Sequence, residues 1–121
     1  MRTLLGFGVI VPSRVSPIGI LPEILERARN DISANGGEML FVYLPAYARY
    51  RVLVGEGVPG RREVLSAVHD LGIPLLDLDL VFRSTGDPEA LWAHPRGHLN
   101  PDGYAVMASA IQAALADVSS P

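Results

Sequence analysis

Histidines are the side chains of this sequence best suited to move protons at neutral pH, and one of them has a favourable position. The chain contains three: His69, His94 and His98. His98 comes two residues before Asn100, which with the proline after it has the pattern of a helix N-terminus. An imidazole at a helix end, with an ordinary pKa of about 6.5, can take a proton from a hydroxyl nucleophile and return it to a leaving group. His98 is therefore a candidate general base, and from its position alone the favoured alternative is a partly exposed loop histidine that caps or packs.

A metal site is not expected among these histidines. His94 and His98 are four residues apart, a spacing that binds zinc when both stand on one helix. Pro95 and Gly97 lie between them and argue against a helix. No glutamate accompanies the pair in the metalloprotease arrangement. We therefore predict no metal and no cofactor.

Two aspartates, Asp77 and Asp79, alternate at the end of an apolar run. They could pair for acid–base chemistry, since two neighbouring carboxyl groups can have different pKa values. They could equally cap the turn that follows a strand, a common role for aspartate. Capping is the favoured interpretation of the two.

Apolar spacing predicts alternating helices and strands around these residues. Helical spacing begins at Pro22 and stops at an Asn-Gly-Gly sequence, and Asn100 with Pro101 starts a last helix. Two short, continuously apolar runs are typical of strands buried on both faces of a parallel sheet. The predicted helices cover residues 22–34, 61–71 and 101–118, and the predicted strands cover residues 39–44 and 73–78.

This order of elements predicts an α/β fold with a parallel sheet flanked by helices in three layers, of the flavodoxin-like kind. At 121 residues the chain is expected to form a single domain, residues 1–121, or a large part of one. Ligands of such sheets bind beyond the carboxyl ends of the strands. The long connections 45–60 and 79–99 lie there. The first is rich in tyrosine and arginine, which fits a substrate wall and a packed-down lid equally well: Tyr43, Tyr47, Arg49, Tyr50 and Arg51.

Composition excludes several classes of function. The net charge is −3, and the ten basic residues, all arginine, are scattered, so no nucleic-acid footprint is present. The absence of cysteine removes disulfides and thiolate metal sites. No apolar run reaches the ~20 residues that a membrane span needs. The apolar start contains two glycines and lacks a clear cleavage site, so no signal peptide is expected and the location is cytoplasmic by default.

The sequence around the candidate base resembles a known family. Residues 97–104 read Gly-His-Leu-Asn-Pro-Asp-Gly-Tyr and follow the stretches 72–78 and 86–92. Together these are similar to the C-terminal block of SGNH (GDSL-like) hydrolases, which supplies the catalytic histidine, then an asparagine and a glycine that opens the final helix. Residues 36–45 are similar to the strand before the family's substrate-side loop. The resemblance spans roughly residues 21–115. It implies a serine ester hydrolase in which His98 is the general base and the substrate is a small acyl ester, for example an acetyl group on a sugar.

The nucleophile block of that family is missing from this chain. In the family a Gly-Asp-Ser block after the first strand carries the nucleophile, and two further blocks contribute oxyanion groups. None of these blocks is present, so we expect the chain to be the C-terminal portion of such a domain and to be inactive in isolation. None of the following serines has Gly-Asp before it: Ser13, Ser16, Ser33, Ser66, Ser84 and Ser109.

The family's aspartate, which orients the histidine, also has no obvious counterpart. It normally lies two or three residues before the histidine, where this chain has Arg96 and Pro95. An arginine there disfavours the imidazolium cation. Asp102 could replace the aspartate if the helix turn brought it round, but a first-turn carboxylate that favours the helix dipole is its expected role. Family members that rely on a Ser–His pair oriented by a backbone carbonyl are compatible with this loop.

A non-enzymatic alternative stays open: a catalytically inactive SGNH-like module for binding or assembly. A sheet without its N-terminal strands exposes an apolar edge, and such an edge pairs with another chain. This alternative predicts a homodimer or a complex with a partner through the exposed edge. The identity of the substrate and the oligomeric state are not specified by the sequence.

Overall fold

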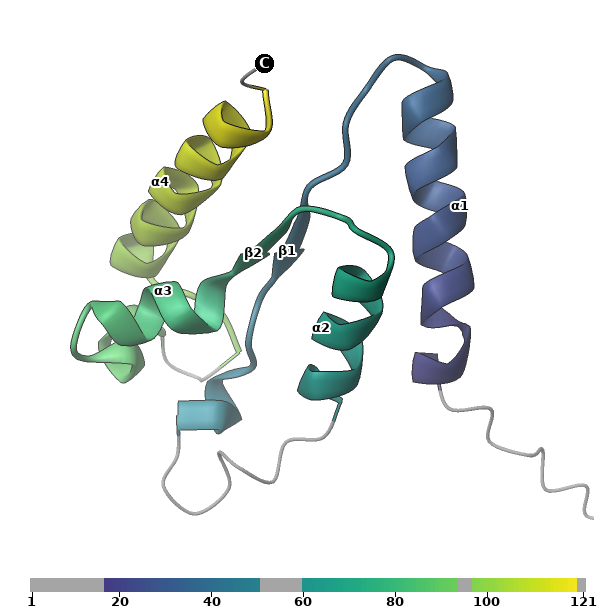
Figure 1. Ribbon diagram of the computed structural model, residues 1–121. Helices are drawn as coiled ribbons and strands as arrows, with labels where there is room; N and C mark the ends of the chain where they lie inside the picture. Colours follow the sequence, from purple (N-terminus) through teal and green to yellow (C-terminus); the bar gives the residue numbers. More distant parts are fainter. Residues whose placement is uncertain (1–16, 51–59, 94–96, 120–121) are drawn as a thin grey trace, which may run out of the picture.

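The computed structural model describes residues 17–50, 60–93 and 97–119 (Figure 1). Helices and two short strands alternate along this part of the chain, with single-turn 3-10 helices between them. The α-helices are α1 (Leu21–Ala34), α2 (Arg61–Asp70), α3 (Leu78–Ser84) and α4 (Pro101–Val118); the strands are β1 (Phe41–Tyr43) and β2 (Leu75–Asp77); the 3-10 helices are η1 (Pro17–Ile20), η2 (Tyr47–Tyr50) and η4 (Pro88–Leu91).

The two strands pair in parallel, with Phe41 opposite Leu75 and Tyr43 opposite Asp77. α2 connects them, as a parallel pair requires. Helices α1 and α2 lie on one side of the strands, and α3 and α4 lie on the other (Figure 1). The prediction of an α/β chain with a parallel sheet between helices is therefore confirmed for the described residues.

Side chains of β1 alternate between two hydrophobic clusters, one on each face of the sheet. Phe41 packs against the cluster of α1 and α2, which is built on Leu25, Val68 and Ile73. Val42 packs against the cluster on the opposite face. Successive side chains of a strand point to opposite faces, so a single strand anchors both helical layers. The second cluster consists of Tyr50, Leu78, Phe82, Leu91, Trp92 and Leu99.

The strands are shorter and less buried than the sequence predicted. Phe41, Val42 and Tyr43 are each half-buried, and Leu75 is 38% exposed. The prediction of burial on both faces is therefore wrong for the strand residues 41–43 and 75–77, although Ile73 and Leu78 at the ends of the second run are buried. The physical reason is the width of the sheet: a sheet of two strands has an edge at each strand, so helices cover the faces but nothing described covers the edges.

Helix α3 was not predicted: its first residue, Leu78, was assigned to the strand 73–78, and the rest of the helix falls in the connection 79–99. Asp77 is its N-cap and accepts a hydrogen bond from the backbone N–H of Asp79 at 3.0 Å. Leu78 and Phe82 are four residues apart, share one helix face, and are fully buried. The helix carries the chain from the sheet into the second hydrophobic cluster, and so it determines where the loop with His98 begins.

The start of α4 is the part of the fold that the sequence predicted most sharply. The side-chain oxygen of Asn100 accepts a hydrogen bond from the N–H of Gly103 at 2.9 Å, which confirms the predicted N-cap. The side-chain amide of Asn100 also donates to the carbonyl of Ala90 at 2.7 Å, and its backbone N–H donates to the carbonyl of Leu91 at 2.9 Å. Asn100 therefore joins α4 to η4.

Gly103 is buried where α4 crosses η4, and this generates a prediction. A β-carbon at Gly103 would lie 2.2 Å from the carbonyl oxygen of Leu91 and 3.1 Å from Leu99. Glycine to alanine within a helix ordinarily stabilises by about 1 kcal/mol. Here we expect Gly103→Ala to lower the free energy of unfolding by about 1–3 kcal/mol, because the backbone of η4 must move. Urea denaturation measures the difference.

Gly97→Ala is the matched control, since nothing lies within 4 Å of a β-carbon at that position. It should change the free energy of unfolding by no more than about 0.5 kcal/mol. A Gly103→Ala variant as stable as the unchanged protein would show that α4 and η4 are not in this close contact.

Candidate functional site

His98 lies on a loop whose two ends are pinned together. The N–H of Ala93 donates to the carbonyl of His98 at 2.9 Å, and Trp92 and Leu99 form an isolated antiparallel bridge. Trp92 and Leu99 are buried in the second cluster, whereas the side chain of His98 is exposed. The backbone therefore holds the histidine in place and leaves its imidazole accessible to a substrate. His94, Pro95 and Arg96 lie outside the described residues.

No described side chain orients the imidazole of His98. Within 17–50, 60–93 and 97–119, neither a carboxylate nor a serine hydroxyl forms a hydrogen bond or ion pair with it. Asp102 lies in the first turn of α4, as expected for a carboxylate that favours the helix dipole. It does not act as the histidine's partner in this structure.

The described serines lie within helices or at their C-terminal ends, and Ser119 is the C-cap of α4. Ser33, Ser66 and Ser109 lie within α1, α2 and α4, as the sequence indicated. Ser84 ends α3, and its hydroxyl donates to the carbonyl of Val81 at 2.6 Å. Ser13 and Ser16 lie outside the described residues. None of the described serines is therefore poised as a nucleophile activated by His98.

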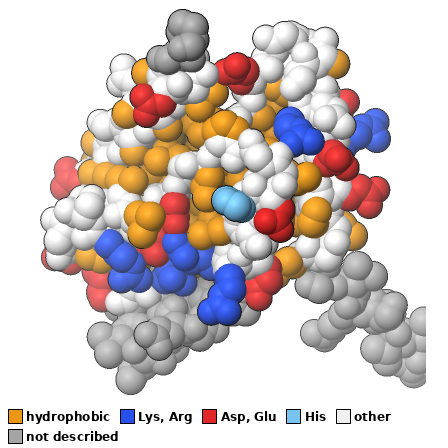
Figure 2. Space-filling view, in the orientation of Figure 1, with side chains coloured by type: hydrophobic (Ala, Val, Ile, Leu, Met, Phe, Trp, Pro, Cys, Tyr) orange, Lys and Arg blue, Asp and Glu red, His pale blue; other side chains and the backbone are white. Residues whose placement is uncertain are grey.

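A cluster of charged side chains fills the carboxyl end of the sheet, and the sequence did not predict it. Asp79 is 2% exposed and accepts hydrogen bonds from Nε of Arg49 at 3.0 Å and from Nε of Arg83 at 3.2 Å. Arg61 pairs with Asp77, and its Nε lies 3.6 Å from Asp79. Figure 2 shows the hydrophobic side chains across this face and arginines gathered below them. We call these five residues the Arg–Asp cluster.

The Arg–Asp cluster settles the role of the two aspartates. Burial raises the pKa of Asp79, but contacts with Arg49 and with the hydroxyl of Tyr50, together with the nearby guanidinium charges, lower it by more. The net result is a pKa below the usual range, so Asp79 is an anion at neutral pH. Asp77 caps α3 and pairs with Arg61. Capping and ion pairing, rather than shared acid–base chemistry, account for both carboxylates.

The tyrosines that follow β1, Tyr47 and Tyr50, pack against Trp92 and do not form the open wall of a substrate site. The ring of Tyr47 lies edge-on to Trp92 with centroids 5.8 Å apart, and Tyr50 is buried beside Trp92 at 6.4 Å. Arg83 lies 5.1 Å from the ring of Tyr50. Burial, reinforced by Asp79, raises the pKa of Tyr50, and burial also raises the pKa of Tyr43. These phenols keep their protons at neutral pH and cannot serve as general bases.

Trp92 connects the Arg–Asp cluster to the loop of His98. Its ring contacts Tyr47 and Tyr50, which flank Arg49, and its backbone bridges to Leu99 beside His98. The histidine and the charged cluster therefore belong to the same end of the molecule. Three guanidinium groups face two carboxylates there, which leaves one positive charge uncompensated within the cluster.

No group of three His, Cys, Asp or Glu residues in the described part of the chain is arranged to hold a metal ion. Among the same residues, no helix has the length and apolarity needed to cross a membrane. Comparison with known proteins adds no assignment: no protein-family model matches the sequence, and no curated protein or solved structure matches it.

Removal of the central carboxylate tests the structural role of the Arg–Asp cluster. In Asp79→Asn, guanidinium groups of Arg49 and Arg83 lose the charge that pairs them in a buried site. We expect the free energy of unfolding to fall by about 3–5 kcal/mol, the usual cost of breaking a buried ion pair. The control is Asp31→Asn, because Asp31 pairs with Arg27 on the exposed face of α1 and should contribute about 0.5 kcal/mol or less. Equal effects of the two substitutions would contradict this role.

The same carboxylate predicts a pH dependence of stability. Because the pKa of Asp79 is lower in the folded protein, its contribution is complete above the unfolded pKa of about 3.9. The contribution is lost as the pH falls through the folded pKa. The free energy of unfolding of the unchanged protein should therefore approach that of Asp79→Asn as the pH falls below about 4. Urea titrations at a series of pH values measure this, and two parallel curves would show that Asp79 is not held ionised.

Proposed function

We propose that this chain supplies the histidine-bearing, C-terminal portion of an SGNH-type serine ester hydrolase, with His98 as its general base. One observation carries the proposal: an exposed imidazole stands on a backbone-pinned loop directly before a capped helix, at the carboxyl end of a parallel strand pair. That end is where α/β sheets bind their ligands. The resemblance of residues 97–104 to the histidine block of the family supports the same role.

In the proposed reaction a serine hydroxyl attacks the carbonyl carbon of a small acyl ester. His98 takes the hydroxyl proton as the new C–O bond forms, and backbone N–H groups stabilise the oxyanion. The tetrahedral intermediate collapses, the bond to the alcohol breaks, and His98 gives the proton to the departing oxygen. Water then hydrolyses the acyl-enzyme, again with His98 as base. The serine comes from a Gly-Asp-Ser block that this sequence does not contain, and no cofactor takes part.

The packing around His98 favours the Ser–His form of the mechanism. A carboxylate would normally hold the imidazole in the productive tautomer and stabilise its cation. Asp79 is the buried carboxylate at this end of the described sheet. It already forms ion pairs with Arg49 and Arg83. A backbone carbonyl is then the orienting group, as in family members without the aspartate.

A second candidate function is a catalytically inactive SGNH-like module for binding or assembly. It is favoured by the same lack of an orienting partner at His98 among the described residues, and by the unpaired edge of β1. An inactive domain keeps the fold of its relatives while its catalytic contacts decay. The two candidates differ in what His98 contributes, so a single substitution separates them.

Hydrolysis of p-nitrophenyl acetate tests the proposal. The 121-residue chain alone should hydrolyse the ester no faster than its own His98→Ala variant. Joined to in-frame upstream coding sequence that contains a Gly-Asp-Ser block, the protein should be active, and His98→Ala should lower kcat about 10²–10⁴-fold, the range for loss of a general base. His69→Ala is the control, because His69 is exposed on α2 and pairs with its neighbour Asp70.

Each outcome has a definite meaning. Equal activity of the extended protein with and without His98 would contradict the proposed base. An extended protein that never hydrolyses the ester would support the module instead. Strong turnover by the 121-residue chain alone, lost in His98→Ala, would keep His98 as the base but contradict a nucleophile from outside this sequence.

A further inference from the structure

Helix α4 is largely apolar around its whole circumference, although little of it is buried. None of residues 103–116 is charged, and of the 18 residues of the helix only Gly103 is buried. A helix that is hydrophobic all round is ordinarily covered on more than one side. In Figure 1 α4 forms one side of the described structure, and no described element lies beyond it. Its outer surface therefore calls for a covering element.

One face of α4 already packs in the core. Val106, Met107 and Ala110 are half-buried against the second hydrophobic cluster, and Gly103 lies against the carbonyl of Leu91. These positions are three or four residues apart and so share one face of the helix. The covering element must contact a different face.

A second apolar row lies about a quarter turn around α4 from the core face. Tyr104 is 50% exposed and Leu115 is 49% exposed, Ala108 between them is exposed, and the remaining members are half-buried. Successive members are four, three, four and three residues apart, which is the spacing by which two helices pack along each other. We call this row the α4 seam: Tyr104, Ala108, Ile111, Leu115 and Val118.

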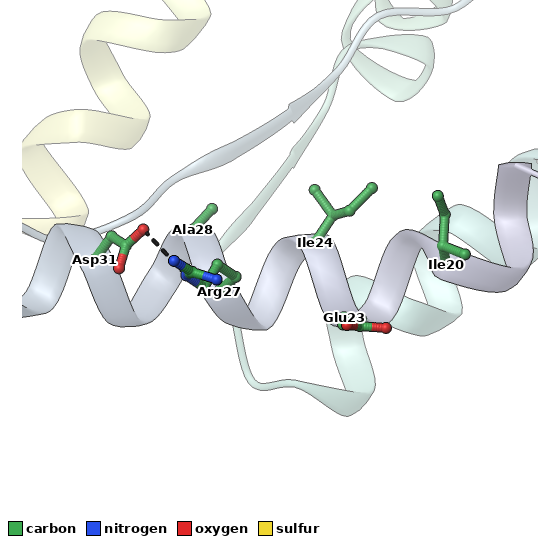
Figure 3. A pocket seen from close by; sticks show the side chains of 6 residues that line it. All are labelled: Ile20, Glu23, Ile24, Arg27, Ala28 and Asp31. Atoms are coloured by element: carbon green, nitrogen blue, oxygen red, sulfur yellow. Dashed lines mark ion pairs between the residues drawn. The ribbon is translucent and has the colours of Figure 1, made fainter.

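The outer face of α1 also exposes apolar side chains, but it is less suited to a partner. Figure 3 shows Ile20 and Ile24 on this face. The same face carries the charged side chains of Glu23, Arg27 and Asp31, and a hollow of about 650 Å³ lies over it. Burial of this face would remove charges from water, whereas burial of the α4 seam would remove none. The α4 seam is therefore the exposed row that a partner can cover with the smaller desolvation penalty.

We propose that the α4 seam is a homodimer interface, in which α4 packs antiparallel against α4 of a second copy of this chain. The inference does not depend on the proposed function. In this pairing Tyr104 packs against Leu115 of the partner subunit, and Ala108 packs against Ile111 of the partner subunit. Two-fold symmetry repeats each contact, so the same row on both copies forms a continuous apolar interface.

Side-chain sizes favour the antiparallel direction. In a parallel pair Ala108 would face Ala108 of the partner subunit and leave a gap between the layers of Tyr104 and Ile111. In the antiparallel pair Ile111 of the partner subunit fills that space. The antiparallel arrangement also places the positive N-terminus of each helix beside the negative C-terminus of the other.

The charges of α4 leave this interface free. Asp102 and Asp117 are the charged residues of the helix, and both lie by helical periodicity on the side away from the α4 seam. Pairing of two copies therefore brings no like charges together across the contact. A surface that complements itself in size and carries no charge fits a second copy of the same chain.

Sedimentation equilibrium of the 121-residue chain tests the proposal. The unchanged chain should show a monomer–dimer equilibrium across a dilution series. Leu115→Asp should raise the dissociation constant at least about 30-fold, the effect of losing one central contact of an interface. Ser109→Asp is the matched control, because Ser109 is exposed on the side of α4 away from the seam, and it should leave the constant unchanged. Circular dichroism should show the same helix content in both variants.

Cysteine variants test the direction of pairing without a new charge, because the chain has no cysteine of its own. Tyr104→Cys and Leu115→Cys are oxidised separately and as an equal mixture, and disulfides are scored on non-reducing gels. In the antiparallel pair residue 104 of one copy meets residue 115 of the other, within reach of a disulfide. Covalent dimers should therefore form in the mixture and in neither variant alone. Ser109→Cys should form none with either variant.

Three results would overturn the proposal. A chain that stays monomeric throughout the dilution series would leave the α4 seam to another part of the chain or to a different protein. A dimer to which Leu115→Asp and Ser109→Asp do equal damage, or none, would place the interface elsewhere, for example at the unpaired edge of β1. Disulfides in each cysteine variant alone, with no increase in the mixture, would contradict the antiparallel direction.

Discussion

The buried carboxylate of Asp79 is the constraint on which the carboxyl end of this fold depends. Its negative charge lies in the interior and is tolerated because guanidinium groups from three separate elements converge on it: Arg49 of η2, Arg61 of α2 and Arg83 of α3. The segment after β1, the first turn of α2 and the helix after β2 are thus joined at one point. Two of the three arginines also stack on tyrosine rings, which limits their side-chain freedom.

Aromatic side chains connect the Arg–Asp cluster to the loop that carries His98. Tyr47 and Tyr50, on either side of Arg49, press against Trp92, and Trp92 forms the bridge that closes the loop of His98. Asn100 then fixes the start of α4 against η4. The exposed histidine is therefore held by aromatic packing, a backbone bridge and a helix cap on the segments that flank it.

What the sequence predicted correctly was local, and what it missed depends on contacts between distant residues. The cap at Asn100 and the glycine stop after α1 follow from residues within one turn of each other. The Arg–Asp cluster joins Arg49 to a residue thirty positions away, and scattered arginines carry no mark of such convergence. Helix α3 was missed because seven residues are too few to show a helical repeat of apolar side chains. The capping residue Asp77, followed by Leu78 and Phe82 four residues apart, was nevertheless a usable signal. Strand burial was overestimated because apolar runs say nothing about the width of a sheet.

The choice of arginine over lysine at all three cationic positions of the cluster has a consequence for alkaline conditions. A guanidinium keeps its proton up to a pKa above about 12, whereas a buried ammonium releases its proton readily. The neighbouring phenol of Tyr50 is likewise held in its neutral form. Base therefore cannot discharge the cations that surround Asp79, whereas acid protonates Asp79 and removes the charge on which these three arginines converge.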